Sequence, residues 1–273
     1  MVKTLTLVGH EVEFSAPQGD AYLESMSMSG PVDVLPIFEK FAMPGGIVID
    51  VGANIGVTSI ISGRLVGDGC VVALEPVPDT FKHLQLNVER SALDNVTCLM
   101  AAAGSEEGEV QLVTQTGSNF AAFVGYKDVL DRYTDYNVYS ARVVPLDLVA
   151  ADQRLTNVDF IKIDVEGYEL EVLRGAKATL NRFKPVVFLE ANNYCLNIFR
   201  RISLVDFTEE ILSVFPIVFA VDTSFAFLDL TDHSTHPNFF HSNVVLGRYP
   251  NLLCGFDPTV KAGLQLIADQ ANN

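Results

Sequence analysis

The sequence predicts an α/β protein with a doubly wound, mostly parallel sheet, and three observations predict it. Six short apolar runs of strand length follow one another along the chain, and helical patterns separate most of them. The runs are apolar on both faces, which is typical of strands covered by helices on each side. A chain of 273 residues, 49% of them hydrophobic, is long enough to bury such a core without disulfides or a structural metal.

The elements follow from these runs in order. Strands are expected at IVIDV from Ile47, CVVALE from Cys70, VTCLMAA from Val96, DFIKIDV from Asp159, PVVFLEA from Pro185 and IVFAVD from Ile217. Helices are expected over residues 57–66, 78–91, 169–183 and 204–214. The run FFHSNVVLGRY predicts a last strand, which would complete a C-terminal antiparallel hairpin. These elements make up one main domain, residues 46–273.

The first 45 residues are predicted to form a flap and a helix in front of that domain. The alternation from Lys3 to Phe14 predicts a hairpin that turns at Gly9 and His10. From Pro31 the apolar residues have helical spacing, and Pro44 and two glycines end the pattern.

An insertion at residues 104–145 interrupts the alternation of strands and helices. It begins with a strand-like GEVQLV and contains four of the eight tyrosines, Tyr126, Tyr133, Tyr136 and Tyr139. A long insertion in a compact domain is usually a lid or a binding loop, and tyrosines supply contact surface at low entropy cost. A cover helix with its tyrosines packed against the domain is the alternative.

The charge balance excludes two classes of partner. The formal net charge is −16 and no basic cluster exceeds the pair Arg200–Arg201, so we expect neither nucleic acid nor an anionic membrane surface as partner. No uncharged apolar run reaches transmembrane length, and the N-terminus lacks a signal-peptide pattern. Four widely spaced cysteines indicate reduced thiols, so a cytoplasmic location is expected.

The turn after the first apolar strand, in GIVIDVGANIGVTSI, is the most informative segment. Gly52 allows a tight turn and the close approach of a ligand, and a helix begins after Gly56. The spacing lacks the G-x-G-x-x-G that accommodates a pyrophosphate. Asp50, at the strand end, would repel a diphosphate but could hold an ammonium group. This charge layout suits the methionyl part of S-adenosylmethionine.

The next two strand ends extend this site. Glu75 follows the second strand, where a carboxylate can accept hydrogen bonds from both ribose hydroxyls, and Pro76 lies beside it. Ala101 and Ala102, with Ala103, follow the third strand, and such small residues leave room for a flat adenine ring. Core packing explains the alanines equally well.

The combined motifs resemble the FkbM-type S-adenosylmethionine-dependent methyltransferases. The resemblance rests on VIDVGANIGVTS, VVALEPVPDTFKHLQLNV, VPLDLV and VDFIKIDVEGYELEVLRGAKATL, and it covers residues 47–190 apart from the insertion. It implies a Rossmann-like class I methyltransferase fold and O-methylation of a small molecule, natural product or saccharide. It also implies that Asp50, Gly52, Asn54 and Gly56 hold the methionyl end, that Glu75 binds the ribose, and that Asp164 lies near the sulfonium.

Methyl transfer to a hydroxyl requires a group that accepts the hydroxyl proton. Asp164 and Glu166 follow the fourth strand and Glu190 ends the fifth, on the ligand-binding edge of an open α/β sheet. Glu166 could instead only favour the dipole of the following helix. Of the histidine group His233, His236 and His241, we expect His241 to serve as the base if the last strand folds over the pocket.

Three alternatives accompany this hypothesis. Asp164, Glu190 and either Asn192 or Asn193 could hold Mg²⁺, although no metal is expected. Lys162, inside a buried strand, should pair with Asp147 or Glu190. The protein could also be a NAD-dependent oxidoreductase, which has an acid after its second strand as well, but such an enzyme needs the G-x-G-x-x-G motif that this sequence lacks. It could finally be a non-catalytic Rossmann-like binding protein, but such a protein would not need the acids at the strand ends.

Overall fold

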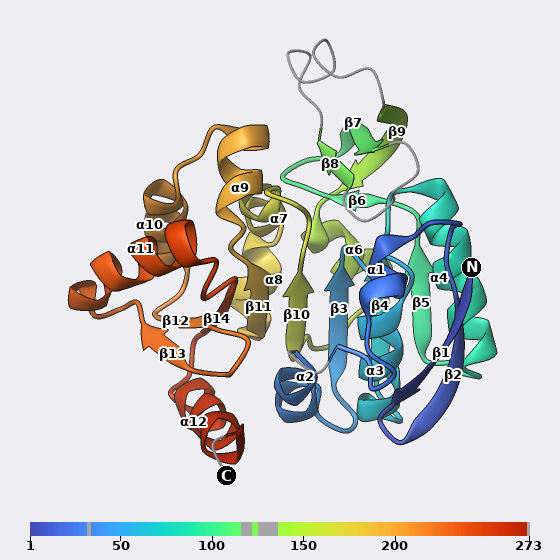
Figure 1. Ribbon diagram of the computed structural model, residues 1–273, viewed down its shortest axis with the longest axis horizontal. Helices are drawn as coiled ribbons and strands as arrows, with labels where there is room; N and C mark the ends of the chain where they lie inside the picture. The colour runs from blue at the N-terminus through green and yellow to red at the C-terminus, as the bar shows by residue number, and fades with distance from the viewer. Residues whose placement is uncertain (32–33, 116–121, 125–135, 272–273) are drawn as a thin grey trace.

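The computed structural model describes residues 1–31, 34–115, 122–124 and 136–271, and an eight-stranded sheet lies at its centre (Figure 1). The strand order is β13-β12-β14-β11-β10-β3-β4-β5. The neighbouring pairs from β11 to β5 are parallel, whereas β14 is antiparallel to both β11 and β12. The strands are β3 (Ile47–Val51), β4 (Cys70–Leu74), β5 (Val96–Leu99), β10 (Phe160–Ile163), β11 (Val186–Glu190), β12 (Ile217–Val221), β13 (Phe227–Asp229) and β14 (Asn251–Gly255). The predicted mostly parallel sheet is confirmed.

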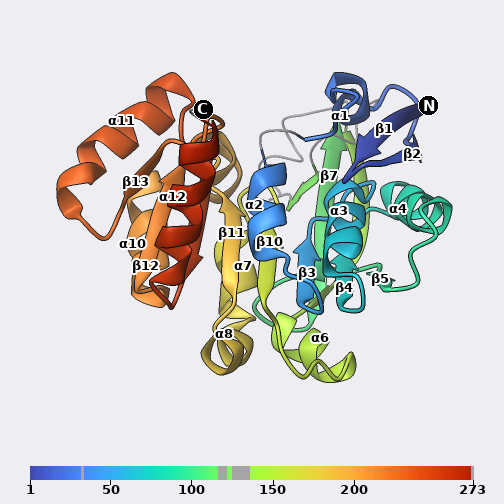
Figure 2. The ribbon, with the colours of Figure 1, turned by 90° about the horizontal axis from the view of Figure 1, so that it is seen from below.

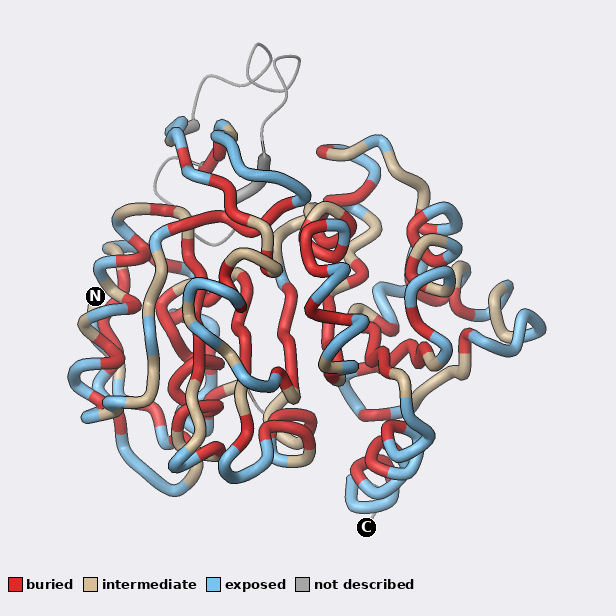
Figure 3. Tube along the Cα trace, turned by 180° about the vertical axis from the view of Figure 1, so that it is seen from behind, coloured by how far each residue is buried: buried red, intermediate tan, exposed pale blue. Residues whose placement is uncertain are grey.

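Helices cover both faces of this sheet, as Figure 2 shows. One face packs against α2 (Leu35–Phe41), α3 (Val57–Val66), α4 (Pro78–Arg90) and α12 (Thr259–Ala271). The other packs against α6 (Leu146–Asp152), α7 (Glu169–Arg174), α8 (Lys177–Phe183), α10 (Leu204–Val214) and α11 (His236–Leu246). Alternate residues of one strand enter the two cores, so that Val48 packs on the first face and Ile49 on the second. The central strands are therefore buried along most of their length (Figure 3).

The N-terminal hairpin, β1 (Val2–Leu7) and β2 (His10–Ser15), is confirmed and belongs to the first of these cores. Asn87 of α4 fastens it. The Asn87 amide nitrogen donates to the carbonyls of Ser15 and Ile55, and the Asn87 Oδ1 atom accepts from the N–H of Ser15. The short helix α1 (Ala21–Ser25) follows. Residues on both sides of the expected boundary at residue 45 thus contribute to one hydrophobic core.

The strands of the described part of the insertion are β7 (Gly108–Gln115), β8 (Ala122–Val124) and β9 (Tyr136–Val144), and the cover helix given as the alternative is absent from that part. Together with β6 (Ala102–Ala103) they form a second sheet in the order β6-β9-β7-β8. It lies above the carboxyl ends of the central strands (Figure 1). Tyr139, on β9, packs against a small apolar cluster that includes Val77 and Leu112. Tyr126 and Tyr133 lie outside the described residues.

Two predictions of secondary structure are wrong. The run from Phe239 to Tyr249 is not a strand, because α11 occupies most of it. Pro237 in its first turn and the left-handed Gly247 after its end are strong helix start and stop signals, and they outweigh the β-branched residues between them. The C-terminal hairpin is instead β12 with β13.

The helix expected over residues 169–183 is broken into α7 and α8. Gly175 lies between them, and a Cβ atom there would lie 1.9 Å from the carbonyl oxygen of Gly104. A short helix α9 (Asn193–Cys195) and a π-helical turn (Leu196–Arg200) follow β11. Among the described residues, no helix has both the length and the apolar character needed to span a bilayer.

Candidate active site

A cavity of about 410 Å³ opens at the carboxyl ends of β3, β4, β10 and β11. Much of its wall comes from the ends of these strands and from the residues after them and after β5, namely residues 52–54, 75–77, 101–103 and 162–166, together with Glu190. Its volume falls in the range of about 300 to 1,000 Å³ that is common for small-molecule sites. Loops at this edge of an open α/β sheet are the usual place for ligands.

The segment before β3 and the start of β14 supply a further part of the wall. These residues are Tyr22, Pro31, Val34, Phe38, Pro250 and Asn251. The sequence analysis missed them, since they come from segments in which no motif was identified. For Asn251 the only signal is structural, because β14 is antiparallel to β11 and places it opposite Glu190.

The glycine turn after β3 is required by packing within the protein. Gly52 has a φ of +75°, and a Cβ atom there would lie 1.9 Å from the carbonyl oxygen of Asp164. Gly56 has a φ of +94° and precedes α3, but it does not line the cavity. Asn54 does line it, and the Asn54 Oδ1 atom is buried with no hydrogen-bond partner among the described residues.

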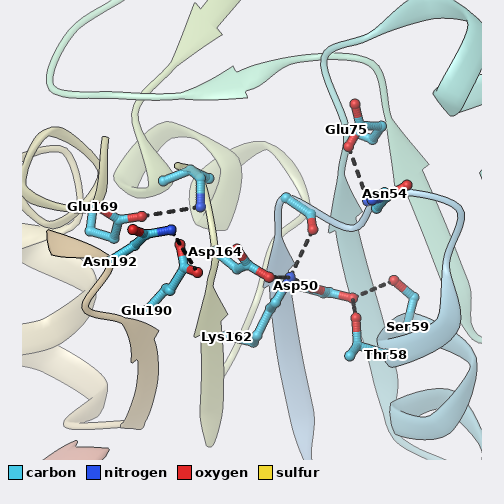
Figure 4. A network of polar contacts seen from close by, with 12 residues as sticks. Asp50, Asn54, Thr58, Ser59, Glu75, Lys162, Asp164, Glu169, Glu190 and Asn192 are labelled. Carbon is cyan, nitrogen blue, oxygen red and sulfur yellow. Dashed lines mark hydrogen bonds and ion pairs between the residues drawn. The ribbon is translucent and has the colours of Figure 1, made fainter. Parts of the chain in front are cut away.

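Asp50 is fully buried and is not among the residues that line the cavity, and its contact with a ligand stays a prediction. Figure 4 shows its polar contacts inside the protein. Its Oδ2 atom accepts hydrogen bonds from the hydroxyls of Thr58 (2.7 Å) and Ser59 (2.6 Å). Its Oδ1 atom lies 3.5 Å from the Lys162 ammonium. Asp50 therefore acts as a counterion inside the protein.

Lys162 joins the ends of β3 and β10. Its ammonium donates to the Gly52 carbonyl at 2.7 Å and forms ion pairs with Asp164 (3.3 Å) and Asp50 (3.5 Å). Burial alone lowers the pKa of Lys162, but the charges of Asp164 and Asp50 outweigh it and raise the pKa above the ordinary value. The predicted partners were wrong. Asp147 instead accepts from two N–H groups at the start of α8.

Glu75 lies in the cavity wall at the end of β4. Its two carboxylate oxygens accept the N–H groups of Asn54 (3.0 Å) and Val77 (2.9 Å). Burial raises the pKa of Glu75 to about 7, although these two hydrogen bonds oppose the shift. Pro76, Ala101 and Ala102 line the cavity beside it. The backbone thus holds this carboxylate in a fixed orientation toward the cavity.

Three of the predicted catalytic acids, Asp164, Glu166 and Glu190, line the same cavity. Burial raises the pKa of Glu190 well above the ordinary value, and the charges of Asp164, Glu166 and Glu169 add to the shift. The Asn192 amide nitrogen lies 3.4 Å from Glu190 Oε1, whereas Glu190 Oε2 is buried without a hydrogen-bond partner among the described residues. Glu166 accepts from the Cys195 thiol at 3.0 Å, and burial, then the charge of Asp164, raises its pKa to about 7.

The helix that follows Glu166 begins at Glu169, as expected, so Glu166 lies before its first turn. Glu169 is the residue that the sequence analysis missed in this motif. Its carboxylate accepts from the N–H groups of Val165 (3.2 Å) and Gly167 (3.1 Å) and so fixes the turn after β10. Burial raises the pKa of Glu169 to about 7. Its position in the first helical turn, where a carboxylate reaches preceding N–H groups, is a signal that could have found it.

His241 is exposed on α11 and lies outside the cavity wall. His233 and His236 also lie outside it, and the His236 ring nitrogen is 2.8 Å from the carbonyl oxygen of Leu230. In the described part of the chain, no group of three or more His, Cys, Asp or Glu side chains has an arrangement that could hold a metal ion. Asn192 caps α9 through its Oδ1 atom.

The parallel sheet, the glycine turn after its first strand and the acids at its strand ends define a Rossmann-like fold of the methyltransferase type. Residues 50–213 match the family described as Methyltransferase FkbM domain, and the chain belongs to this family. It is a methyltransferase family, and the two curated relatives described next carry methyltransferase names.

Two curated relatives and one solved structure illustrate the similarity. "Methyltransferase 1" of Beauveria bassiana is 27% identical over 142 residues, 47% of this chain and 57% of that protein, so the chain spans little more than half of it. The hexuronic acid methyltransferase AglP of Haloferax volcanii is 25% identical over 183 residues, 66% of this chain and 70% of that protein. The crystal structure of an FkbM methyltransferase from Methylobacillus flagellatus has 22% identity and a TM-score of 0.46, and the match covers 73% of this chain and 45% of that one.

Proposed function

We propose that the protein transfers the methyl group of S-adenosylmethionine to a hydroxyl oxygen of a small molecule, natural product or saccharide. The observation that carries this proposal is the fixed carboxylate of Glu75 on the same cavity wall as the turn of Gly52 and Asn54. A carboxylate after the second parallel strand suits a ribose diol, and the turn after the first suits the other end of a nucleoside cofactor. The relative named for a hexuronic acid supports a saccharide acceptor.

The residues present fit this cofactor. The described cavity wall holds four carboxylates, Glu75, Asp164, Glu166 and Glu190, and one cation, Lys162, so it favours a positively charged group. Bound S-adenosylmethionine would supply a methyl group on a sulfonium, which is an activated leaving group. Glu75 would accept the ribose hydroxyls, Pro76, Ala101 and Ala102 would contact the adenine, and Asp164 and Asn54 would hold the amino-acid end.

Glu190 is our choice for the group that accepts the hydroxyl proton. Its Oε2 atom has no hydrogen-bond partner among the described residues, whereas Glu166 is bonded to Cys195 and Asp164 is paired with Lys162. Burial raises the pKa of Glu190, which makes its carboxylate a stronger base than an exposed one. The Asn192 amide near its other oxygen would orient it.

Calorimetric titration with S-adenosylhomocysteine tests the cofactor. We expect wild-type protein to bind it and not NAD. Glu75→Ala should weaken binding about 10- to 100-fold, because hydrogen bonds to a charged group contribute about 1.5–3 kcal/mol each. His241→Ala, on the exposed face of α11, is the matched control and should leave the affinity unchanged. A folded wild-type protein that binds only NAD, or neither ligand, would contradict the proposal.

Glu190→Gln tests the proton acceptor. Loss of a general base lowers turnover by about 10² to 10⁴-fold, so S-adenosylhomocysteine formation with a panel of hydroxyl compounds should fall by that amount. Affinity for S-adenosylhomocysteine should change by less than about threefold, since Glu190 is assigned to the acceptor and not to the cofactor. Turnover equal to wild type would remove Glu190 from the mechanism.

We also propose a cytoplasmic location. All four cysteines are free thiols, and two of them, Cys195 and Cys254, are buried. Unpaired cysteines in a chain of this size are typical of reducing compartments. Fractionation of cells that express the tagged protein, with detection in the soluble cytoplasmic fraction, tests this proposal.

A further inference from the structure

The cavity is acidic at the carboxyl ends of β10 and β11. Asp164, Glu166 and Glu190 line it there, and Glu169 lies directly behind them, close enough for its charge to raise the pKa of Glu190. The Glu190 Oε2 atom is buried and has no hydrogen-bond partner in the described part of the protein. A buried acceptor without a partner costs free energy, and a ligand that donates a hydrogen bond to it would remove that cost.

No described basic group in this wall is available to an anion. Lys162 is the one cation that lines the cavity within the described residues, and its ammonium contacts Gly52, Asp50 and Asp164. Two carboxylates of the protein therefore already compensate the charge of this ammonium. The nearby Arg200 does not line the cavity. Its guanidinium pairs with Glu171 at 3.4 Å and lies over the ring of Tyr168, 4.6 Å from its centre.

We propose that the acceptor is a neutral or ammonium-bearing hydroxyl compound, and that a carboxylate or phosphate beside the reacting hydroxyl excludes a molecule from this site. This inference rests on the proposed function and names the substrate class of the same cavity. A carboxylate or phosphate on the acceptor would lie against Glu166 and Glu190, and the one described cation of the wall, Lys162, is already paired. Such like-charge contacts are strongly unfavourable in a low-dielectric site. The reacting hydroxyl would donate a hydrogen bond to Glu190, and an ammonium group on the acceptor would compensate the negative charge of Glu166.

The acceptor of this protein would then differ in charge from that of its relative AglP, whose name gives a hexuronic acid as substrate. A sugar acid carries the carboxylate that the described wall has no group to neutralise. The difference between a sugar and the corresponding sugar acid is therefore the sharpest probe of this inference.

The experiment compares acceptors that share a scaffold and differ in charge. One triplet is methyl glucoside, methyl glucuronide and methyl glucosaminide, and a second is methylcatechol, protocatechuate and dopamine. The readout is S-adenosylhomocysteine formed by the whole 273-residue chain, given as kcat/KM for each acceptor. We expect the neutral or ammonium member of a triplet to exceed the carboxylate member at least tenfold.

A charge-neutral variant tests the cause. Glu166→Gln keeps the shape of the side chain and removes one carboxylate. It should therefore lower the ratio of kcat/KM between the neutral and the carboxylate acceptor at least threefold. Glu209→Gln removes an exposed carboxylate from α10, outside the cavity, and should leave the preference unchanged.

Two results would overturn the inference in a protein that binds S-adenosylhomocysteine. One is a carboxylate member that is turned over as fast as its neutral analogue, and the other is a panel in which no neutral or ammonium member reacts. Failure of the proposed function gives a different result, because the protein would then not bind S-adenosylhomocysteine at all.

Discussion

Replacement of Lys162 by methionine is the most informative perturbation of the site. Methionine has a similar length but no charge, so it removes the hydrogen bond to the Gly52 carbonyl and both ion pairs. Asp50 would then keep a fully buried carboxylate whose remaining partners are the hydroxyls of Thr58 and Ser59. A buried charge without its counterion is strongly destabilising.

The magnitude follows from the contacts. Removal of one partner of a buried ion pair costs about 3–5 kcal/mol. For a chain of this size each kcal/mol lowers Tm by about 2–4 °C, so Lys162→Met should lower Tm by about 6–20 °C. The pKa of Lys162 is higher in the folded protein than in the unfolded chain. The contribution of Lys162 to stability is therefore fully present below the ordinary pKa of lysine, and it is lost only as the pH rises through the higher pKa of the folded state. The loss of Tm should therefore be constant between about pH 6 and pH 9.

A second substitution separates two roles of Lys162. Asp50→Asn in the Lys162→Met background removes the uncompensated charge and should restore most of the lost Tm. If Lys162 also orders the cavity wall through Gly52 and Asp164, the double variant should still bind S-adenosylhomocysteine at least about tenfold more weakly than wild type. Circular dichroism gives Tm and calorimetry gives the affinity. Wild-type affinity in the stable double variant would refute the ordering role, and an unchanged Tm in the single variant would refute the buried ion pair.

The remaining predictions concern pH and the glycine turn. Glu75, Glu166 and Glu169 have pKa values of about 7, above the ordinary carboxyl value, so the native state binds more protons than the unfolded state between about pH 4.5 and pH 7. Their contribution to stability should therefore fall as the pH rises from about 4.5 to about 7, and Tm measured at a series of pH values should fall with it. Glu169→Gln should make this fall in Tm smaller. A wild-type Tm that rises over the same pH range would contradict the prediction. Gly52→Ala should abolish binding of S-adenosylhomocysteine or prevent folding, because its Cβ atom would meet a carbonyl oxygen at 1.9 Å. Gly45→Ala, with a similar φ of +76° and no atom within 4 Å, should cost only about 1–2 kcal/mol, and equal losses in both variants would refute the steric argument.

Much of the sheet could be predicted because its local signals agree with the fold. The apolar runs at Ile47, Cys70 and Ile217 became strands, and the helix bounds expected over residues 57–66 and 204–214 match α3 and α10. Parallel strands bring their carboxyl ends to one edge, so residues that end different strands were expected to meet there. Gly52, Glu75, Asp164 and Glu190 do line one cavity.

The parts that could not be predicted depend on long-range geometry. The partner of Lys162 is set by the register of β10 against β3, which places Lys162 opposite Asp50, and no local pattern encodes this register. The contribution of Tyr22 and Asn251 to the cavity depends on how distant segments pack. For α11 the sequence held conflicting signals, and the helix-capping residues outweighed the β-branched ones.

The strand-end and helix-start acids look alike in the sequence, but their positions relative to the cavity divide them into two groups. Asp50 and Glu169 lie outside the cavity wall, and their oxygens are held by Lys162, by hydroxyls or by backbone N–H groups. Glu75 and Glu190 face the cavity, and Glu190 retains a buried oxygen without a partner among the described residues. Glu75 also accepts two backbone N–H groups, but it lies in the wall where a ligand can reach it. Substitution of the first group should therefore act on stability, and substitution of the second on binding and turnover.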